Sequence, residues 1–192
     1  MNHLAHFYLA GEDKNLSIGN YIADQVKGKK KNDYSLEIQK GIEMHRSIDA
    51  FTDSHPIIKD SISILKPTLG RYSSVAIDVI NDHYLAKFWN EYSNQKLQDF
   101  VDDRYALIDD NYDLLPHNSQ RFYHFMTSHN ILFNYQYFDK LEMVFQGMSS
   151  RTKFESDLIH SVETLKSEYQ ALKSNFETFF VELDEEFKPW KE

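Results

Sequence analysis

The chain has 192 residues and a formal net charge of −9, and 41% of its residues are hydrophobic. The acidic balance disfavours electrostatic binding to nucleic acid or to an anionic membrane, because both attract cationic surfaces. The absence of cysteine excludes disulfides and thiolate metal sites, and 6 glycines and 4 prolines are too few for a turn-rich all-β fold.

Helical periodicity dominates the sequence, and no alternating strand pattern persists. Breaks fall where proline or glycine interrupts the pattern, as in "DSHP" and "KPTLG", because proline restricts the residue before it and glycine ends helices. We therefore predict an all-α, single-domain helical bundle over residues 1–192. The expected helices are residues 2–10, 17–27, 35–53, 56–66, 73–92, 95–109, 118–129, 132–147 and 152–187.

The first expected helix carries His3 and His6, three residues apart. A lone histidine on an apolar face is usually a hydrogen-bonded core residue, and we expect that role for His3. The amino-terminal stretch meets acidic residues at once and lacks the basic n-region of a signal peptide. No apolar run reaches the length of a membrane span. These features predict a cytoplasmic protein that does not enter a membrane.

The expected helix 35–53 has polar residues within its apolar face. At about 100° per residue, His45 and Asp49 fall between Ile42 and Ile48 in the apolar arc. Burying an unpaired carboxylate costs several kcal/mol, so a cation or a His–Asp pair must compensate it. For these two residues alone, a buried hydrogen-bonded pair and a metal site are equally good interpretations.

The same pattern recurs in two other helices. Asp78 and Asp82 lie four residues apart on an apolar stripe with His83 at its edge, and Asn20 and Asp24 have the same spacing. Residues four apart on a helix present two ligands from one side. Carboxylate oxygens mixed with imidazole suit Mn²⁺, Mg²⁺, Fe²⁺ or Zn²⁺. The clustering of such groups favours a metal site over separate buried pairs.

The order of five segments resembles the acyl carrier protein phosphodiesterase family, a divergent member of the HD phosphatase/phosphodiesterase group. The stretch from His45 to Asp49, which reads "HRSID", is the most specific of them. The resemblance implies an HD-domain-like fold and a metallophosphodiesterase with a divalent ion of the manganese type. The implied reaction releases 4′-phosphopantetheine from holo acyl carrier protein and leaves the apo protein. The five segments are "MNHLAHFYLA", "GNYIAD", "GIEMHRSIDAFTD", "DVINDHYL" and "GMSSR".

The resemblance also directs the choice of site residues. In the wider HD group a histidine directly precedes its aspartate, whereas the adjacent pair here is reversed, as Asp82-His83. The group's ligand assignment therefore does not transfer by motif alone. The first choices as metal and catalytic residues are Asp24, His45, Asp49 and Asp82, and the second choices as ligands are His6 and His83.

Two arginines are candidates for steadying the phosphoryl group. Arg46 points away from the buried arc, so a structural salt bridge is the favoured role for it. Arg151 follows the "GMSS" loop, whose backbone N–H groups would cradle an anion before a helix that begins near Thr152. The alternative for this loop is an ordinary helix end with Gly147 as its cap.

The densest basic run in the sequence follows Asp24 by only a few residues. Because acyl carrier proteins are acidic, an enzyme with a net charge of −9 needs a local basic patch to dock one. The alternative is a solvated loop, which is what most lysine runs form. The run comprises Lys27, Lys29, Lys30 and Lys31.

Two other functions remain open at this point. An HD-type phosphohydrolase acting on a nucleotide or another small phosphate ester would need the same metal site but no docking patch. A non-catalytic helical interaction protein would use the aromatic-rich segment 122–138 as a partner surface, although core packing is the favoured role of such a run. No feature of the sequence indicates an oligomeric state.

Overall fold

The computed structural model describes residues 1–152 and 156–191, and these residues form helices with no strand among them. The predicted all-α fold is therefore confirmed. The α-helices are α1 (His3–Leu9), α2 (Lys14–Ile22), α3 (Leu36–Ser54), α4 (Pro56–Leu69), α5 (Ser73–Lys87), α6 (Leu97–Asp110), α7 (His117–Ser128), α8 (Ile131–Asn134), α9 (Phe138–Ser149), α10 (Ser161–Ser167) and α11 (Tyr169–Phe187). The 3₁₀-helices are η1 (Ala23–Gln25), η2 (Gly28–Asp33), η3 (Gly70–Tyr72), η4 (Trp89–Glu91), η5 (Tyr112–Leu114), η6 (Asp157–His160) and η7 (Lys188–Lys191).

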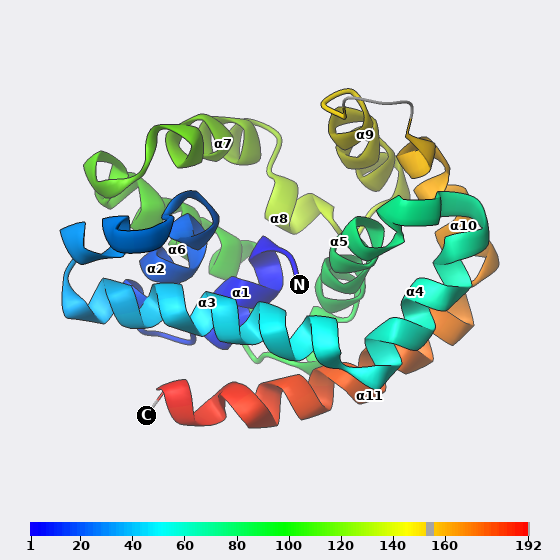
Figure 1. Cartoon of the computed structure of the whole chain (residues 1–192), viewed down its shortest axis with the longest axis horizontal. Coiled ribbons are helices and arrows are strands. Elements are labelled where there is room, and N and C mark those ends of the chain that lie inside the picture. The colour runs from blue at the N-terminus through cyan, green and yellow to red at the C-terminus, as the bar shows by residue number, and fades with distance from the viewer. Residues whose placement is uncertain (153–155, 192) are drawn as a thin grey trace.

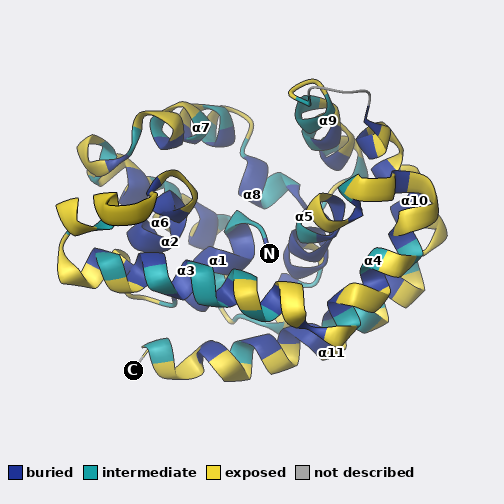
Figure 2. Cartoon of the chain, viewed as in Figure 1, coloured by how far each residue is buried: buried dark blue, intermediate teal, exposed yellow. Residues whose placement is uncertain are grey.

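Helix α1 lies in the centre of the molecule and packs between α2 and α5 (Figure 1). Figure 2 shows that α1 is largely buried, whereas α3, α4 and α11 expose one side to solvent. The buried residues of α1 are Leu4, Ala5, His6, Phe7 and Leu9. The first helix of the chain is thus part of the core, and it carries a histidine there.

Helices α2 and α3 pack closely through two glycines. A Cβ placed on Gly19 would lie 2.3 Å from the carbonyl oxygen of Ile38, and one placed on Gly41 would lie 2.6 Å from the carbonyl oxygen of Leu16. Any side chain at either position would therefore force the two backbones apart. The close approach brings the carboxyl end of α2 beside the middle of α3.

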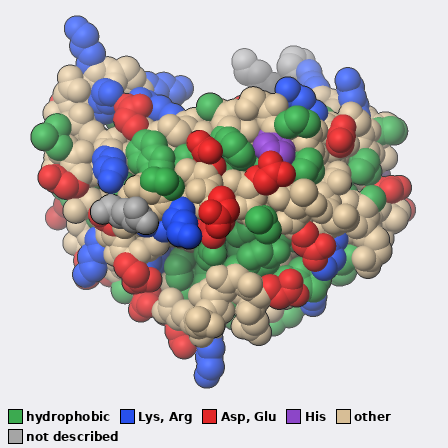
Figure 3. Space-filling view, turned by 90° about the horizontal axis from the view of Figure 1, so that it is seen from below, with side chains coloured by type: hydrophobic (Ala, Val, Ile, Leu, Met, Phe, Trp, Pro, Cys, Tyr) green, Lys and Arg blue, Asp and Glu red, His purple; other side chains and the backbone are tan. Residues whose placement is uncertain are grey.

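Helix α11 covers the outer side of α3 and α4 (Figure 1). The ring of Phe51 in α3 stacks on Phe179 of α11 with centroids 6.2 Å apart, and His55, at the corner between α3 and α4, lies 5.0 Å from the same ring. Helix α3 ends at Ser54 and α4 begins at Pro56, as the "DSHP" stretch predicts. On the face seen in Figure 3, acidic and basic side chains are interspersed with hydrophobic ones, so this face is neither uniformly acidic nor uniformly basic.

Four expected helices differ from the structure. The helix expected at residues 17–27 is α2. It begins earlier, because the Asp13 side chain caps it, and it ends at Ile22, where η1 follows. Residues 73–92 form α5, which ends at Lys87, and the separate η4. Residues 132–147 form α8 and α9, separated where Tyr137 is extended. Residues 152–187 form η6, α10 and α11, and their positions 153–155 lie outside the described residues.

Among the described residues, no helix combines the length and the hydrophobicity that a transmembrane segment needs.

Candidate active site

Three side chains from two helices converge beside the core. His6 comes from α1, and His45 and Asp49 come from successive turns of α3. One ligand atom of each lies within 4.8 Å of the others, and the two imidazole rings stack with centroids 4.1 Å apart. Both histidines are buried, whereas the side chain of Asp49 is 40% exposed, so the cluster is reachable from solvent. We call these three residues the His–Asp cluster.

The protonation of His6 is fixed by a neighbour. The Asn20 amide nitrogen donates to the carbonyl oxygen of Leu16, which turns the amide oxygen toward His6. That oxygen lies 3.0 Å from Nδ1 of His6, so the ring carries its proton on Nδ1 and donates it to Asn20. Burial and the charge of His45 lower the pKa of His6 to about 4, which keeps the ring neutral at pH 7.

The unprotonated nitrogen of His6 faces a carboxylate. Its Nε2 is buried and lies 3.3 Å from Oδ1 of Asp49, and it has no hydrogen-bond partner among the described residues. Burial raises the pKa of the Asp49 carboxyl group, but the hydrogen bond and the positive charge of His45 outweigh it and lower the pKa, so Asp49 is ionised. Two electron-rich atoms this close repel each other unless a positive group lies between them. The donor set therefore fits a cation.

His45 supplies positive charge to the same place. Its Nε2 lies 3.2 Å from Oδ1 of Asp24 and 3.1 Å from Oδ2 of Asp49. Burial lowers the pKa of His45, but the hydrogen bonds to these two carboxylates outweigh it and raise the pKa to about 9. The hydrogen bond from His45 in turn lowers the pKa of Asp24. Without a bound cation, a protonated His45 is thus the group that neutralises the carboxylates.

Asp24 and Asp78 lie at two sides of the cluster. The side chain of Asp24, which follows α2 in η1, is 66% exposed and faces the solvent side of His45. Asp78 of α5 accepts from the amino group of Met1 at 2.9 Å, and the same amino group lies 3.9 Å from Asp49. Asp78 is therefore an ion-pair partner of Met1 next to the cluster.

The structure does not bring Asp82 into the His–Asp cluster. Its two carboxylate oxygens accept the backbone N–H groups of Leu4 and Ala5 at 2.8 and 3.2 Å. These N–H groups belong to the first turn of α1 and have no acceptor within their own helix. Burial raises the pKa of Asp82 to about 7. Asp82 thus holds α1, and with it His6, against α5.

His83 also has other partners than those expected from the sequence. Its Nδ1 donates to the carbonyl oxygen of Tyr135 at 2.8 Å, and its Nε2 accepts from the hydroxyl of Tyr169 at 3.2 Å. Both ring nitrogens are occupied, so the ring has no lone pair to offer to the cluster. Asp82 and His83 thus contact groups outside the cluster, because a shared helix face does not fix which partner a side chain meets.

The two arginines named from the sequence lie in different environments. The guanidinium of Arg46 donates to Glu43 and to the carbonyl oxygen of Val26, at 3.2 and 3.0 Å, which is the structural role favoured for it. Arg151 is exposed and lines a cavity of about 330 Å³ together with Asp24 and His3. Arg151 is therefore the arginine that faces the opening beside the cluster.

The loop before Arg151 does not form an anion cradle. The N–H groups of Ser150, Arg151 and Thr152 donate to carbonyl oxygens of the preceding turn, so none is free to bind an anion. No helix begins at Thr152, which is followed by residues outside the described part of the chain. Gly147 is not a helix cap either, because α9 continues through it to Ser149.

Lys27 immediately precedes η2 and the other lysines of the run lie within it, a few residues after Asp24 in the chain. Lys27, Lys29 and Lys30 are exposed, and Lys31 forms an ion pair with Glu43 at 2.6 Å. Since Glu43 also accepts from Arg46, the run is anchored to α3 two residues before His45. The three exposed lysines form no ion pair with the described residues and can meet a partner.

Sequence reasoning missed several residues that surround the cluster. His3, expected to be a hydrogen-bonded core residue, is instead partly exposed, contacts the Phe122 ring at a tilt with centroids 4.8 Å apart, and lines the cavity that contains Asp24. Asn20 sets the tautomer of His6. The aromatic run 122–138 mostly packs on the core, as favoured, but Phe122 and Phe125 line cavities.

The arrangement as a whole defines a class of protein. It is an all-α protein in which two buried imidazoles meet partly exposed carboxylates at a solvent-accessible opening, a donor set that divalent metal ions accept. The chain belongs to the acyl carrier protein phosphodiesterase family, because the family profile with that description matches residues 1–183.

Relatives with the same description span nearly the whole chain. Acyl carrier protein phosphodiesterase from Yersinia pestis is 33% identical over 184 residues, with 94% of each chain covered. The enzymes of that name from Enterobacter sp. (strain 638) and Klebsiella pneumoniae (strain 342) are 35% and 34% identical over 94% and 95% of each chain. No solved structure matches, so the likeness to an HD domain stays a prediction.

The family membership decides between the function classes left open by the sequence. The family is one of phosphodiester hydrolases, so the predicted enzyme class is confirmed. The alternative of a non-catalytic interaction protein is accordingly set aside.

Proposed function

We propose that this chain is a metal-dependent phosphodiesterase that removes the prosthetic group of holo acyl carrier protein in the cytoplasm. Its products are apo acyl carrier protein and 4′-phosphopantetheine, and residues 1–192 act as one domain. The observation that carries the metal requirement is the neutral His6 nitrogen that faces the ionised Asp49 at 3.3 Å. The family description supports the substrate.

His6, His45 and Asp49 are the residues that would hold a divalent ion, with the carboxylate of Asp24 beside His45 as a fourth ligand. Mn²⁺ is our first choice, and Mg²⁺, Fe²⁺ or Zn²⁺ also accept this mixture of imidazole and carboxylate. Such an ion lowers the pKa of a water molecule and polarises a phosphoryl oxygen. The protein supplies the neutral nitrogen for it through the hydrogen bond between His6 and Asn20.

The roles of the surrounding groups follow from their exposure. The low pKa of Asp24 keeps its exposed carboxylate ionised, so it can accept the proton of an attacking water molecule. The water oxygen bonds to phosphorus as the bond from phosphorus to the serine oxygen breaks, and the serine oxygen takes up a proton. Arg151, which lines the same cavity as Asp24, offsets the negative charge on the phosphoryl oxygens.

The exposed lysines of η2 provide a docking surface for the acidic carrier protein. Lys27, Lys29 and Lys30 lie on the segment that directly follows Asp24, so a carrier protein bound there would present its modified serine to the site.

The test is incubation of purified protein with holo acyl carrier protein and Mn²⁺, followed by mass spectrometry of the carrier protein. We expect a mass loss equal to the prosthetic group, no loss with chelator, and no loss with Asp49→Ala. A panel of nucleotides and small phosphodiesters in parallel separates this function from that of a small-ester phosphohydrolase. Turnover of the panel without turnover of the carrier protein would refute the proposal.

A further inference from the structure

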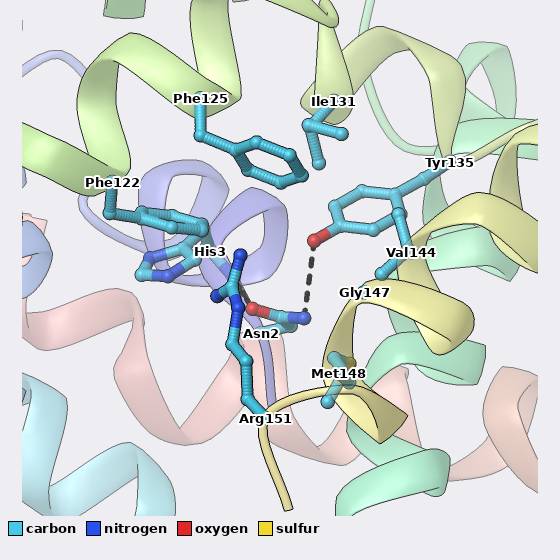
Figure 4. Close-up of a pocket in the computed structure, with 10 residues that line it drawn as sticks. All are labelled: Asn2, His3, Phe122, Phe125, Ile131, Tyr135, Val144, Gly147, Met148 and Arg151. Atoms are coloured by element: carbon cyan, nitrogen blue, oxygen red, sulfur yellow. Dashed lines mark hydrogen bonds between the residues drawn. The ribbon is translucent and has the colours of Figure 1, made fainter.

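A second cavity, of about 230 Å³, has Arg151 and His3 in its wall (Figure 4). Helices α7, α8 and α9 and the residue before α1 contribute to its wall. The wall is mostly apolar, and Figure 4 shows its polar groups near Asn2. The apolar residues that matter below are Phe125, Ile131, Val144 and Met148. We call this space the α9 cavity.

The α9 cavity adjoins the opening beside the cluster. Its neighbour, the cavity of about 330 Å³ that contains Asp24, shares His3, Phe122 and Arg151 with it. Asp24 in turn contacts His45 at 3.2 Å. A chain-like molecule with one end at the cluster would therefore reach the α9 cavity by passing the side chains that the two cavities share.

One polar pair in the α9 cavity has unused hydrogen-bonding capacity. The side-chain amide of Asn2 donates to the hydroxyl oxygen of Tyr135 at 3.2 Å. Tyr135 is buried, and its hydroxyl hydrogen has no acceptor among the described residues. Burial raises the pKa of Tyr135 well above its usual value, so the hydroxyl stays protonated and able to donate. This is the arrangement that a neutral acceptor, such as an amide carbonyl, satisfies.

These features match one part of the proposed substrate. We propose that the α9 cavity binds the distal, amide-bearing arm of phosphopantetheine, with the Tyr135 hydroxyl donating to an amide carbonyl and apolar walls around the methylene groups. The assignment rests on the proposed function for the position of the phosphodiester at the cluster. The arm is neutral beyond its phosphate, which agrees with a cavity whose charged group, Arg151, lies only at the shared entrance.

Gly147 offers a way to fill the cavity without disturbing the fold. It lines the α9 cavity from within helix α9, and a Cβ placed on it would meet no heavy atom within 4 Å. A leucine at this position therefore starts from open space on the cavity wall and occupies space that the arm would use. The preceding residue, Gln146, is exposed and does not line the cavity, so Gln146→Leu is a matched control on the same helix.

The experiment is calorimetric titration of free pantetheine, which lacks the phosphate, into the purified protein without added metal. We expect binding to wild type and to Gln146→Leu, and at least ~10-fold weaker binding to Gly147→Leu, because a side chain in the pocket removes the space for a snugly held group. Thermal unfolding should show both variants as stable as wild type. Tyr135→Phe, which removes the hydroxyl that donates to the ligand and accepts from Asn2, should weaken binding by ~3–10-fold.

The outcomes separate this inference from the function on which it rests. Pantetheine that fails to bind wild type, or that binds Gly147→Leu as well as wild type, would overturn the assignment. Nucleoside monophosphates that bind the same cavity in place of pantetheine would do so too. If holo carrier protein is hydrolysed while pantetheine does not bind, the proposed function stands and the cavity assignment falls. If pantetheine binds as expected but the carrier protein is not hydrolysed, the cavity assignment stands and the function falls.

Discussion

Gly19 of α2 and Gly41 of α3 face each other so closely that a Cβ on Gly19 would lie 2.6 Å from the Cα of Gly41. Asn20 follows one glycine in the chain, and His45 lies one turn beyond the other. The contact between the two glycines thus sets the distance across which the carboxyl end of α2 meets the His–Asp cluster on α3.

Replacing Gly19 by alanine should separate α2 from α3. We expect a loss of ~3 kcal/mol in the free energy of unfolding, near the upper end for overpacking, although alanine is the better helix former. Gly147→Ala is the control, since a Cβ there meets nothing and should stabilise α9 by ~0.5–1 kcal/mol. Urea unfolding measures both, and a Gly19→Ala protein as stable as wild type would contradict the close contact.

Asn20 should act as a positioning residue for His6. Asn20→Leu removes the acceptor for Nδ1 of His6, so we expect ~10–100-fold weaker Mn²⁺ binding, as for other outer-sphere partners. Asn20→Asp keeps an acceptor and should restore the affinity to within a few-fold. Calorimetry with Mn²⁺ measures these values, and equal affinities for the Leu variant and wild type would rule out the role.

Asp49 and Asp82 should respond differently to the same isosteric change. Asp49→Asn removes a proposed ligand and should weaken Mn²⁺ binding more than the ~10–100-fold typical of outer-sphere partners. Asp82→Asn alters only the contact with the first turn of α1 and should leave the affinity within about fivefold of wild type. A larger loss of metal from folded Asp82→Asn would reinstate Asp82 as a ligand.

His45 should make the stability of the metal-free protein depend on pH. Its pKa is raised from 6.5 to about 9 in the folded protein. Its contribution is therefore fully present below pH 6.5 and is lost as the pH rises through 9, and is on the order of 3 kcal/mol. Wild type in chelator should lose this much more stability than His45→Gln between pH 6.5 and 9. If the free energies of unfolding of the two proteins change with pH in parallel, this role of His45 is refuted. Replacing the exposed His117 by glutamine is the control.

The lysines of η2 should affect docking and not chemistry. Changing Lys27, Lys29 and Lys30 to glutamine should raise KM for holo carrier protein by ~10-fold at low salt and flatten its salt dependence, with kcat unchanged. The control changes three exposed lysines elsewhere to glutamine. An unchanged KM, or an equal rise in the control, would remove the docking surface. The control positions are Lys59, Lys66 and Lys87.

Most helices could be predicted because their apolar faces repeat at the helical period and their ends carry proline or glycine. The break before Tyr137 could not, since the segment between α8 and α9 contains neither residue. Tertiary packing decides there, because Tyr135 is buried and its carbonyl oxygen accepts from His83 of α5. A single sequence carries no trace of that partner.

The candidate site was predictable in part for a similar reason. The spacing of His45 and Asp49 places both on one helix face, and the structure brings them together with His6 and Asp24. The same spacing says nothing about what lies opposite a face. For Asp82 the opposite group is the backbone of α1, and backbone N–H groups have no signature in the sequence.

The order of synthesis gives the cover of α3 by α11 a further consequence. Helix α11 leaves the ribosome long after α3, so the aromatic flank of α3 around Phe51 stays uncovered until Phe179 and Phe187 arrive. A nascent chain stalled before residue 169 would therefore expose the aromatic side of α3 to solvent. Chaperones should bind such a fragment, or proteases should degrade it.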